Sequence, residues 1–150
     1  MSRLQSHPFE PEVDKMLSSL NVDLKVAKQI FETGTMYHFT FINTPAYISL
    51  PTFIPTCHDN LIRLEFTIGT VEANEVGRLL FAVALDFDMH RYHPLRIVPR
   101  TKNKKEYEVL LQTVCPADLV KNDFIAATVL YGVELAEFYR QEFLNQNTVA

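Results

Sequence analysis

The sequence predicts an α+β fold, in which a small antiparallel sheet packs with an N-terminal helix, a central helix and a long C-terminal helix. Residues 61–68 alternate apolar and polar side chains, which is typical of a half-buried antiparallel strand. Residues 74–86 and 122–145 instead carry apolar side chains at helical spacing, on more than one side of each helix. The expected order of elements is α-β-β-β-α-β-β-α.

Composition indicates one globular domain over residues 1–150, with a loose arm at 1–8 and a folded body at 9–145. Apolar residues make up 47% of the chain and charged residues 21%, which is typical of a folded protein rather than a disordered one. The formal net charge of −4 argues against a dedicated nucleic-acid binder, which usually carries a basic face.

The expected compartment is the cytoplasm. Only Cys57 and Cys115 are present, too few for a disulfide scaffold and compatible with a reducing environment. No apolar leader segment opens the sequence, and no window approaches the ~18 apolar residues that a membrane span requires. A soluble protein without a membrane partner is therefore predicted.

The first half of the chain predicts one helix, an ambiguous segment and three strands. Apolar residues between positions 13 and 20 share one helical stripe, so a helix is expected over 10–20. Residues 21–34 alternate like a strand at first and then adopt helical spacing; we expect a helix there, with Gly34 able to cap it. Strands are expected at 35–41, 46–50 and 61–68, with the last ended by Gly69.

The second half predicts a helix, a hairpin and a helix. Asn74 is a candidate N-cap for the helix 74–86, and Asn122 for the terminal helix. Between them, strands are expected at 89–98 and 106–114, joined by a polar turn. That turn and its flanks carry a basic set, which could meet an acidic partner but is more simply explained as solvated: Arg96, Arg100, Lys102, Lys104 and Lys105.

Asp86, Asp88 and His90 form the best candidate for chemistry. If the chain is extended there, all three lie on one face and could bind a divalent cation or share a proton, with His93 as a further ligand. The simpler interpretation, which we favour, is a solvated edge where a helix passes into a strand. The Cys57-His58 pair has no second pair at zinc-finger spacing. We therefore predict no catalytic residue, metal or cofactor.

Both predicted helices in the second half have more apolar surface than one side of a small sheet requires. The sequence accordingly predicts contact with other chains. We expect the interaction surface to include Leu79, Phe81 and Val83 for self-association, and Tyr131, Phe138 and Tyr139 on a second face.

The stretch VEANEVGRLLFAVALDFDMHRYHPLRIVP, an asparagine-led helix running into a hairpin, resembles the type III secretion chaperone-like superfamily, and its YbjN-like branch in particular. As topology, the resemblance covers roughly residues 9–144. It implies a small α+β domain, usually dimeric, that binds extended segments of other proteins, and it carries no shared catalytic residues.

Taken together, the residues and the resemblance predict a non-enzymatic protein-binding, chaperone-like module. We expect it to be a homodimer that binds a segment of a partner protein. Two alternatives stay open: a small metal-dependent hydrolytic enzyme that uses Asp86, Asp88 and His90, or a structural subunit of a larger complex.

Overall fold

The computed structural model describes residues 7–51, 61–90 and 95–144. Their arrangement confirms the α+β class, because helices pack with one antiparallel sheet whose strand order is β1-β2-β3-β4-β6-β5. The helices are α1 (Glu10–Leu20), α2 (Val76–His90) and α3 (Asp123–Tyr139). The strands are β1 (Ala27–Phe31), β2 (Gly34–Phe41), β3 (Thr44–Pro51), β4 (Leu61–Glu72), β5 (Arg96–Thr101) and β6 (Glu106–Pro116). Short 3₁₀ segments precede α2 (Ala73–Glu75) and α3 (Ala117–Lys121), and a π-helical turn (Arg140–Leu144) follows α3.

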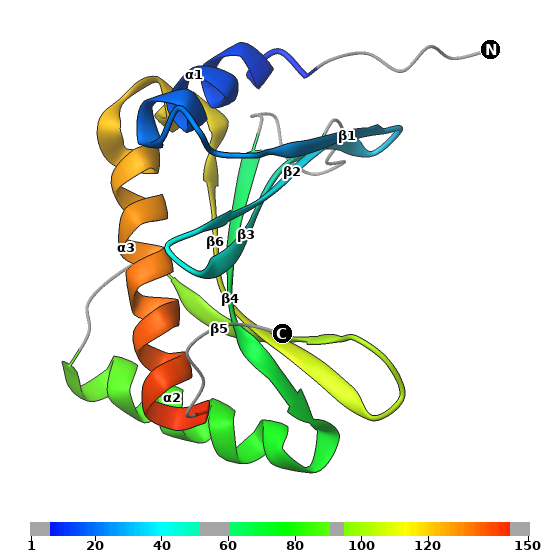
Figure 1. Ribbon diagram of the computed structural model, residues 1–150, viewed down its shortest axis with the longest axis vertical. Coiled ribbons are helices and arrows are strands. Elements are labelled where there is room, and N and C mark those ends of the chain that lie inside the picture. Colours follow the sequence, from blue (N-terminus) through cyan, green and yellow to red (C-terminus); the bar gives the residue numbers. More distant parts are fainter. Residues whose placement is uncertain (1–6, 52–60, 91–94, 145–150) are drawn as a thin grey trace.

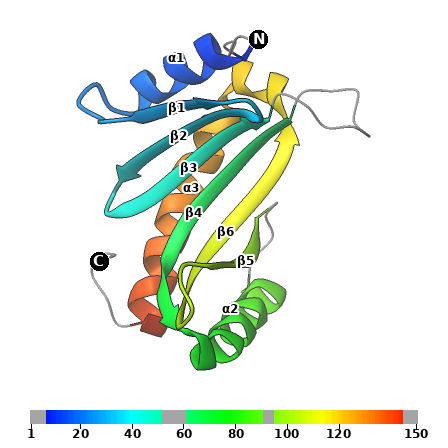
Figure 2. The same cartoon turned by 90° about the vertical axis from the view of Figure 1, so that its right-hand side faces the viewer.

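The helices are distributed unevenly around the sheet. Figure 1 shows α3 running along one face of the curved sheet, with α1 at one end of the molecule and α2 at the other. Figure 2, turned by 90° about the vertical axis, shows the strands in front of α3. Among the described residues, no helix covers that second face.

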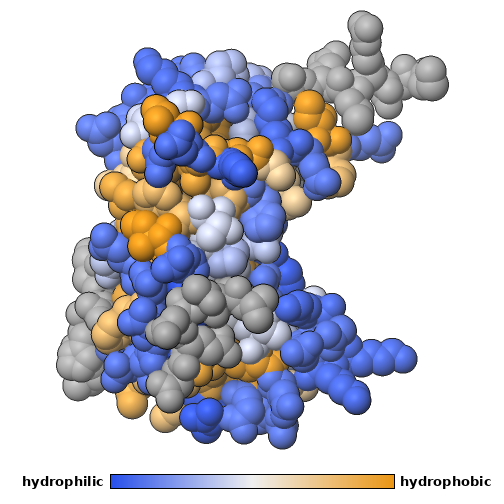
Figure 3. All heavy atoms as spheres, in the orientation of Figure 1, coloured by the Kyte–Doolittle hydropathy of each residue, from blue (hydrophilic) through white to orange (hydrophobic). Residues whose placement is uncertain are grey.

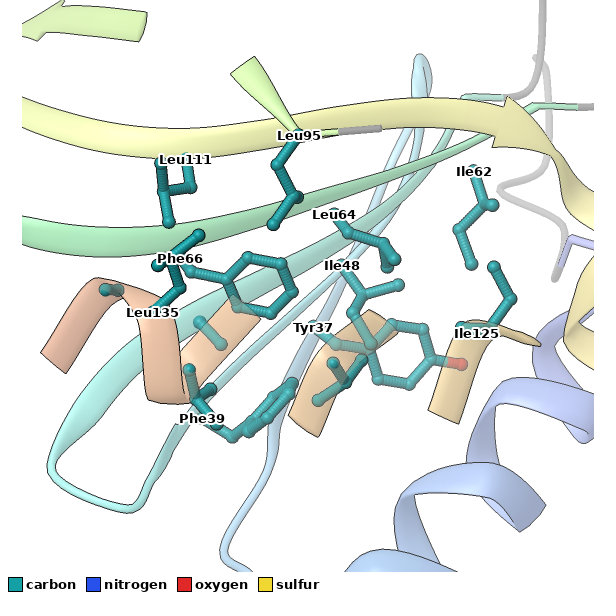
Figure 4. Close-up of a cluster of buried hydrophobic side chains, with 14 of the residues drawn as sticks. Tyr37, Phe39, Ile48, Ile62, Leu64, Phe66, Leu95, Leu111, Ile125 and Leu135 are labelled. Atoms are coloured by element: carbon teal, nitrogen blue, oxygen red, sulfur yellow. The ribbon is translucent and has the colours of Figure 1, made fainter. Parts of the chain in front are cut away.

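The core lies between α3 and the sheet. Alternate residues of the central strands point toward α3, as strand geometry requires, and they are fully buried. Figure 4 shows this layer, in which Phe66, Ile48 and Tyr37 of the sheet belong to the same buried cluster as Ile125 and Leu135 of α3. Gly132 lets α3 approach closely, because a Cβ atom there would lie 2.3 Å from Cε2 of Phe66. The sheet and α3 therefore form one continuous packing unit.

A buried arginine anchors the end of α3. Arg140 has no exposed surface, and burial lowers the pKa of its guanidinium. Its Nη1 donates to the carbonyl oxygens of Thr67 and Ile68 at 3.2 and 3.4 Å. Its Nη2 donates to the Asn43 carbonyl at 3.1 Å and to the Thr44 hydroxyl at 3.2 Å. One side chain thus joins α3 to β4 and to the β2–β3 turn.

Several predicted elements are confirmed. The helix expected at 10–20 is α1, and the strands expected at 35–41, 46–50 and 106–114 correspond to β2, β3 and β6. Asn122 caps α3 as expected, because its side-chain oxygen accepts a hydrogen bond of 2.9 Å from the Phe124 amide.

The helix expected at 21–34 is wrong. Residues 27–31 form β1, which pairs with β2 from Ala27 opposite His38 to Phe31 opposite Gly34. All residues of β1 are exposed, so pairing to a neighbouring strand, rather than apolar periodicity, determines its conformation. Gly34 does not cap a helix. It has φ of +146° and lies against the backbone of Leu50, where a Cβ atom would meet the carbonyl oxygen at 2.3 Å. The extra strand makes the order α-β-β-β-β-α-β-β-α.

The boundaries around α2 also differ from the prediction. Strand β4 continues past Gly69 to Glu72, with a β-bulge between Thr67 and Gly69. Asn74 lies inside a 3₁₀ turn instead of capping the helix. The helix continues to residue 90, and the strand expected to begin at 89 begins at Arg96.

His7, which was expected in the N-terminal arm at 1–8, is buried. Its amide donates to Oε2 of Glu10 at 2.7 Å, and its Nδ1 accepts from the Phe9 amide at 3.2 Å. Glu10 is itself buried and receives Lys28 Nζ at 3.0 Å and the Thr35 hydroxyl at 2.9 Å. This cluster joins the start of α1 to β1 and β2.

Candidate functional site

Among the side chains of α2 that the structure describes, Phe81 is the most exposed large apolar one, at 71%, and Leu85 one turn later is 51% exposed. Gly77 lies one turn before Phe81, with no atom within 4 Å of the position its Cβ would take. Positions four apart form a ridge along a helix, so Gly77, Phe81 and Leu85 share one outward ridge. We call these three residues the α2 ridge.

The other two residues expected for self-association belong to the core. Leu79 is 3% exposed and Val83 is fully buried. They lie on the side of α2 that faces the rest of the molecule, so they hold the helix in place and do not form its outer surface. Of the three α2 residues that sequence reasoning selected, only Phe81 is accessible.

Helix α3 presents a second apolar stripe. Phe124, Tyr131 and Phe138 are 42%, 38% and 42% exposed and recur every seven residues, a spacing that keeps them near one line along the helix. Tyr139, which was expected beside them, is fully buried. Its hydroxyl donates a 2.5 Å hydrogen bond to Oδ2 of Asp86, which joins α3 to α2.

The extended backbone that a shared face of Asp86, Asp88 and His90 would require is not present. Residues 86, 88 and 90 lie in α2, and a helical backbone rotates positions two apart by roughly 200°, so they do not share one face as they would in an extended chain. Within the described ranges, no group of three or more His, Cys, Asp or Glu residues could hold a metal ion. Cys57, His58 and His93 lie outside those ranges.

A polar row crosses the helix-free face of the sheet. The strand register places His38 opposite Tyr47, Tyr47 opposite Glu65, Glu65 opposite Gln112, and Gln112 opposite Arg96. The row therefore runs across β2, β3, β4, β6 and β5. Figure 3 shows that the surface is hollowed on this side of the molecule and that the atoms around the hollow are mainly hydrophilic.

Glu65 is the buried centre of this row. Its side chain is 4% exposed, and its Oε2 accepts hydrogen bonds from Arg100 Nη2 and, at 2.8 Å, from Gln112 Nε2. The Gln112 oxygen in turn accepts from Arg96, at 3.1 Å from Nε and 2.6 Å from Nη2. Arg100 also lies 3.8 Å from a carboxylate oxygen of Glu108. These groups form one connected network in which each buried polar atom named here has a partner.

An aromatic pair ends the row on the β2 side. The rings of His38 and Tyr47 are stacked, with centroids 4.5 Å apart and planes 5° apart. The Arg100 guanidinium lies 5.6 Å from the Tyr47 ring centroid, within cation–π range. Burial, with a further contribution from Glu108, raises the pKa of the Tyr47 hydroxyl, so it stays protonated at neutral pH.

Sequence reasoning assigned part of this face correctly and missed the rest. The alternation in 61–68 placed Glu65 on the polar side of its strand, but it did not identify the partners, which come from distant strands. Arg96 and Arg100 were attributed to a solvated turn, whereas both lie on β5 and bond to the sheet face. Lys102 and Lys104 do lie in the exposed connection between β5 and β6.

Comparison of the chain with protein-family models gives no match, and comparison with curated proteins gives none either. In the part of the chain that the structure describes, none of the helices combines the length and the apolar character needed to cross a membrane.

Proposed function

We propose that this protein is a non-enzymatic, chaperone-like binding module that forms a homodimer through α2 and binds a segment of a partner protein. The α2 ridge carries the proposal. Phe81 is 71% exposed on a helix whose opposite side is already buried, and a side chain of this size usually gains by leaving water.

The geometry of the ridge favours a second copy of α2 as its cover. Ridges of residues spaced four apart pack into the grooves of a partner helix in the commonest class of helix crossing. Gly77 adds no side chain beside Phe81, which leaves room for close approach of another backbone. A twofold axis would let Phe81 of each copy meet the same ridge on the other, as the interfaces of symmetric dimers require.

Partner binding is supported by apolar surface outside α2. The exposed stripe of Phe124, Tyr131 and Phe138 on α3 offers aromatic side chains of the kind enriched at protein interfaces. The resemblance to secretion chaperones points in the same direction. The two-cysteine composition is the reason for proposing the cytoplasm as the compartment.

Analytical ultracentrifugation tests the homodimer. We expect the wild-type protein to sediment as a dimer at micromolar concentration. Phe81→Asp should raise the dimer dissociation constant by about a hundredfold or more, because it would bury a carboxylate without a partner. Val22→Asp is the matched control, since Val22 is 89% exposed and lies between α1 and β1.

A wild-type protein that stays monomeric up to about 100 μM would contradict the proposal, because stable dimers of standard interface size associate far below that concentration. Equal weakening by Phe81→Asp and Val22→Asp would also contradict it, since the effect would then come from added charge and not from the α2 ridge.

A further inference from the structure

The helix-free face carries charges of both signs, which are distributed unevenly along β4 and β6. Arg63, Arg96 and Arg100 lie on the helix-free face together with Glu65 and Glu108, and farther along β4 and β6 the same register places Glu72 opposite Glu106. Arg100 pairs with both Glu65 and Glu108. Among the described residues, Arg63 and Arg96 are therefore the arginines of this face that have no carboxylate partner, on a chain whose formal net charge is −4.

Arg96 is held in place without being neutralised. Its Nε and Nη2 donate to the neutral amide oxygen of Gln112, so its orientation is fixed while its charge has no carboxylate partner among the described residues. The N–H groups on the outer edge of the guanidinium, including those of Nη1, can still donate hydrogen bonds to another acceptor. Arg63 is exposed on the same face and likewise forms no ion pair within the described ranges. Two cations on the concave face are thus available to an anionic ligand.

The size and shape of the row favour an extended chain as the ligand. From His38 on β2 to Arg96 on β5 the row covers four strand spacings, or roughly 19 Å, which matches about six residues of extended polypeptide. One end of the row offers the flat His38–Tyr47 stack, and the other end offers guanidinium groups. A ligand that fits both ends needs an aromatic or apolar group separated from a carboxylate by several residues.

We propose that this concave sheet face binds an extended, acidic segment of a partner protein. Carboxylate side chains of the segment bind Arg96 and Arg63, and an aromatic side chain of the same segment stacks on the exposed ring of His38. Glu65 and Gln112 are positioning residues, which fix the two β5 arginines. This inference rests on the proposed binding function and specifies the chemistry of the partner segment.

The test uses a fluorescein-labelled peptide of about eight residues, long enough to cross the row, with a tyrosine near one end and glutamates near the other. Its binding to the full chain is followed by fluorescence anisotropy, and the same peptide with glutamines replacing the glutamates is the ligand control. We expect the glutamate peptide to bind at least about tenfold more tightly, because the hydrogen bonds to Arg96 are then charge-assisted.

Matched variants locate the binding site. Arg96→Gln should weaken binding of the glutamate peptide by about tenfold, and Arg63→Gln by about threefold. Lys104→Gln removes the same charge from the exposed β5–β6 turn and should leave binding unchanged. Amide chemical shifts should move in β3, β4 and β6 when the peptide is added. Thermal unfolding of each variant confirms that the fold is intact, and the Arg63 substitution breaks no hydrogen bond within the described residues.

Three results would overturn the inference: equal binding of the glutamate and glutamine peptides, equal weakening by Arg96→Gln and Lys104→Gln, or tighter Arg96-dependent binding of a single-stranded oligonucleotide than of the peptide. Ultracentrifugation in the same buffer separates this failure from failure of the proposed function. If the wild-type protein is a dimer but does not bind the peptide, only the proposed site on the sheet is contradicted. If the wild-type protein is a monomer, the proposed homodimer is contradicted.

Discussion

Helices α2 and α3 are both apolar on more than one side, yet they differ in what covers them. Helix α3 packs along the sheet, with Gly132 against the ring of Phe66. Helix α2 buries Leu79 and Val83 at the end of the molecule and leaves Phe81 exposed. The comparison shows that hydrophobicity around a helix does not by itself identify an interface. What matters is whether the chain's own sheet reaches that side of the helix.

The largest predicted effect concerns the end of α3. Arg140→Ala should lower the free energy of unfolding by about 3–5 kcal/mol, because it removes four hydrogen bonds and leaves buried carbonyl oxygens without donors. Urea denaturation measures the loss. Gln141→Ala, at the exposed neighbouring position, should cost less than about 0.5 kcal/mol. Similar losses for the two variants would mean that Arg140 does not anchor α3.

Gly132→Ala tests the close contact between α3 and the sheet. The added methyl group would overlap the Phe66 ring, so we expect a loss of about 2 kcal/mol in the free energy of unfolding. Because alanine favours helix more than glycine does, a gain in stability would instead show that the contact is loose. Thermal unfolding followed by circular dichroism distinguishes the two outcomes.

Tyr139→Phe tests the hydrogen bond that links the two helices. Loss of the bond to Asp86 should cost about 1.5 kcal/mol, since the acceptor is a carboxylate. The effect should disappear when Asp86→Ala, which removes the acceptor, is already present, and a double-mutant cycle measures this coupling. If the losses in the free energy of unfolding were additive, Tyr139 and Asp86 would not be coupled, and their hydrogen bond would not hold α2 against α3.

Gly77→Ala should give the smallest effect, with the opposite sign to Gly132→Ala. The site has open space, and alanine is the better helix former, so the free energy of unfolding should rise by about 0.5–1 kcal/mol. The substitution is measured together with Phe81→Asp, so that association does not contribute. Destabilisation would show that α2 packs more tightly at Gly77 than the open space there indicates.

Local patterns predicted the elements whose conformation depends on their own residues. The apolar stripe of α1, the alternation in β4 and the Asn122 cap are of this kind, and all three are present. Strand β1 could not be predicted, because its residues are exposed and its pairing with β2 is tertiary. The continuation of α2 to residue 90 removed the basis for a shared Asp86, Asp88 and His90 face.

The polar row was unpredictable for a related reason. Its members come from strands far apart in the chain, and only the sheet register places Tyr47 beside Glu65 and Glu65 beside Gln112. A charged residue at the polar position of a strand normally faces water. No local signal distinguished Glu65, which is 3% exposed, from Arg63, which is exposed two residues earlier.

In the proposed homodimer, a second copy of the chain covers the α2 ridge. Isotope-filtered NOE measurement on a mixture of ¹³C-labelled and unlabelled protein tests this arrangement directly, because only contacts between copies give signals. We predict intermolecular NOEs from the Phe81 ring to Leu85 and to the Gly77 backbone of the other copy. Intermolecular NOEs that involve other surfaces, with none from the Phe81 ring, would contradict a dimer formed through the α2 ridge.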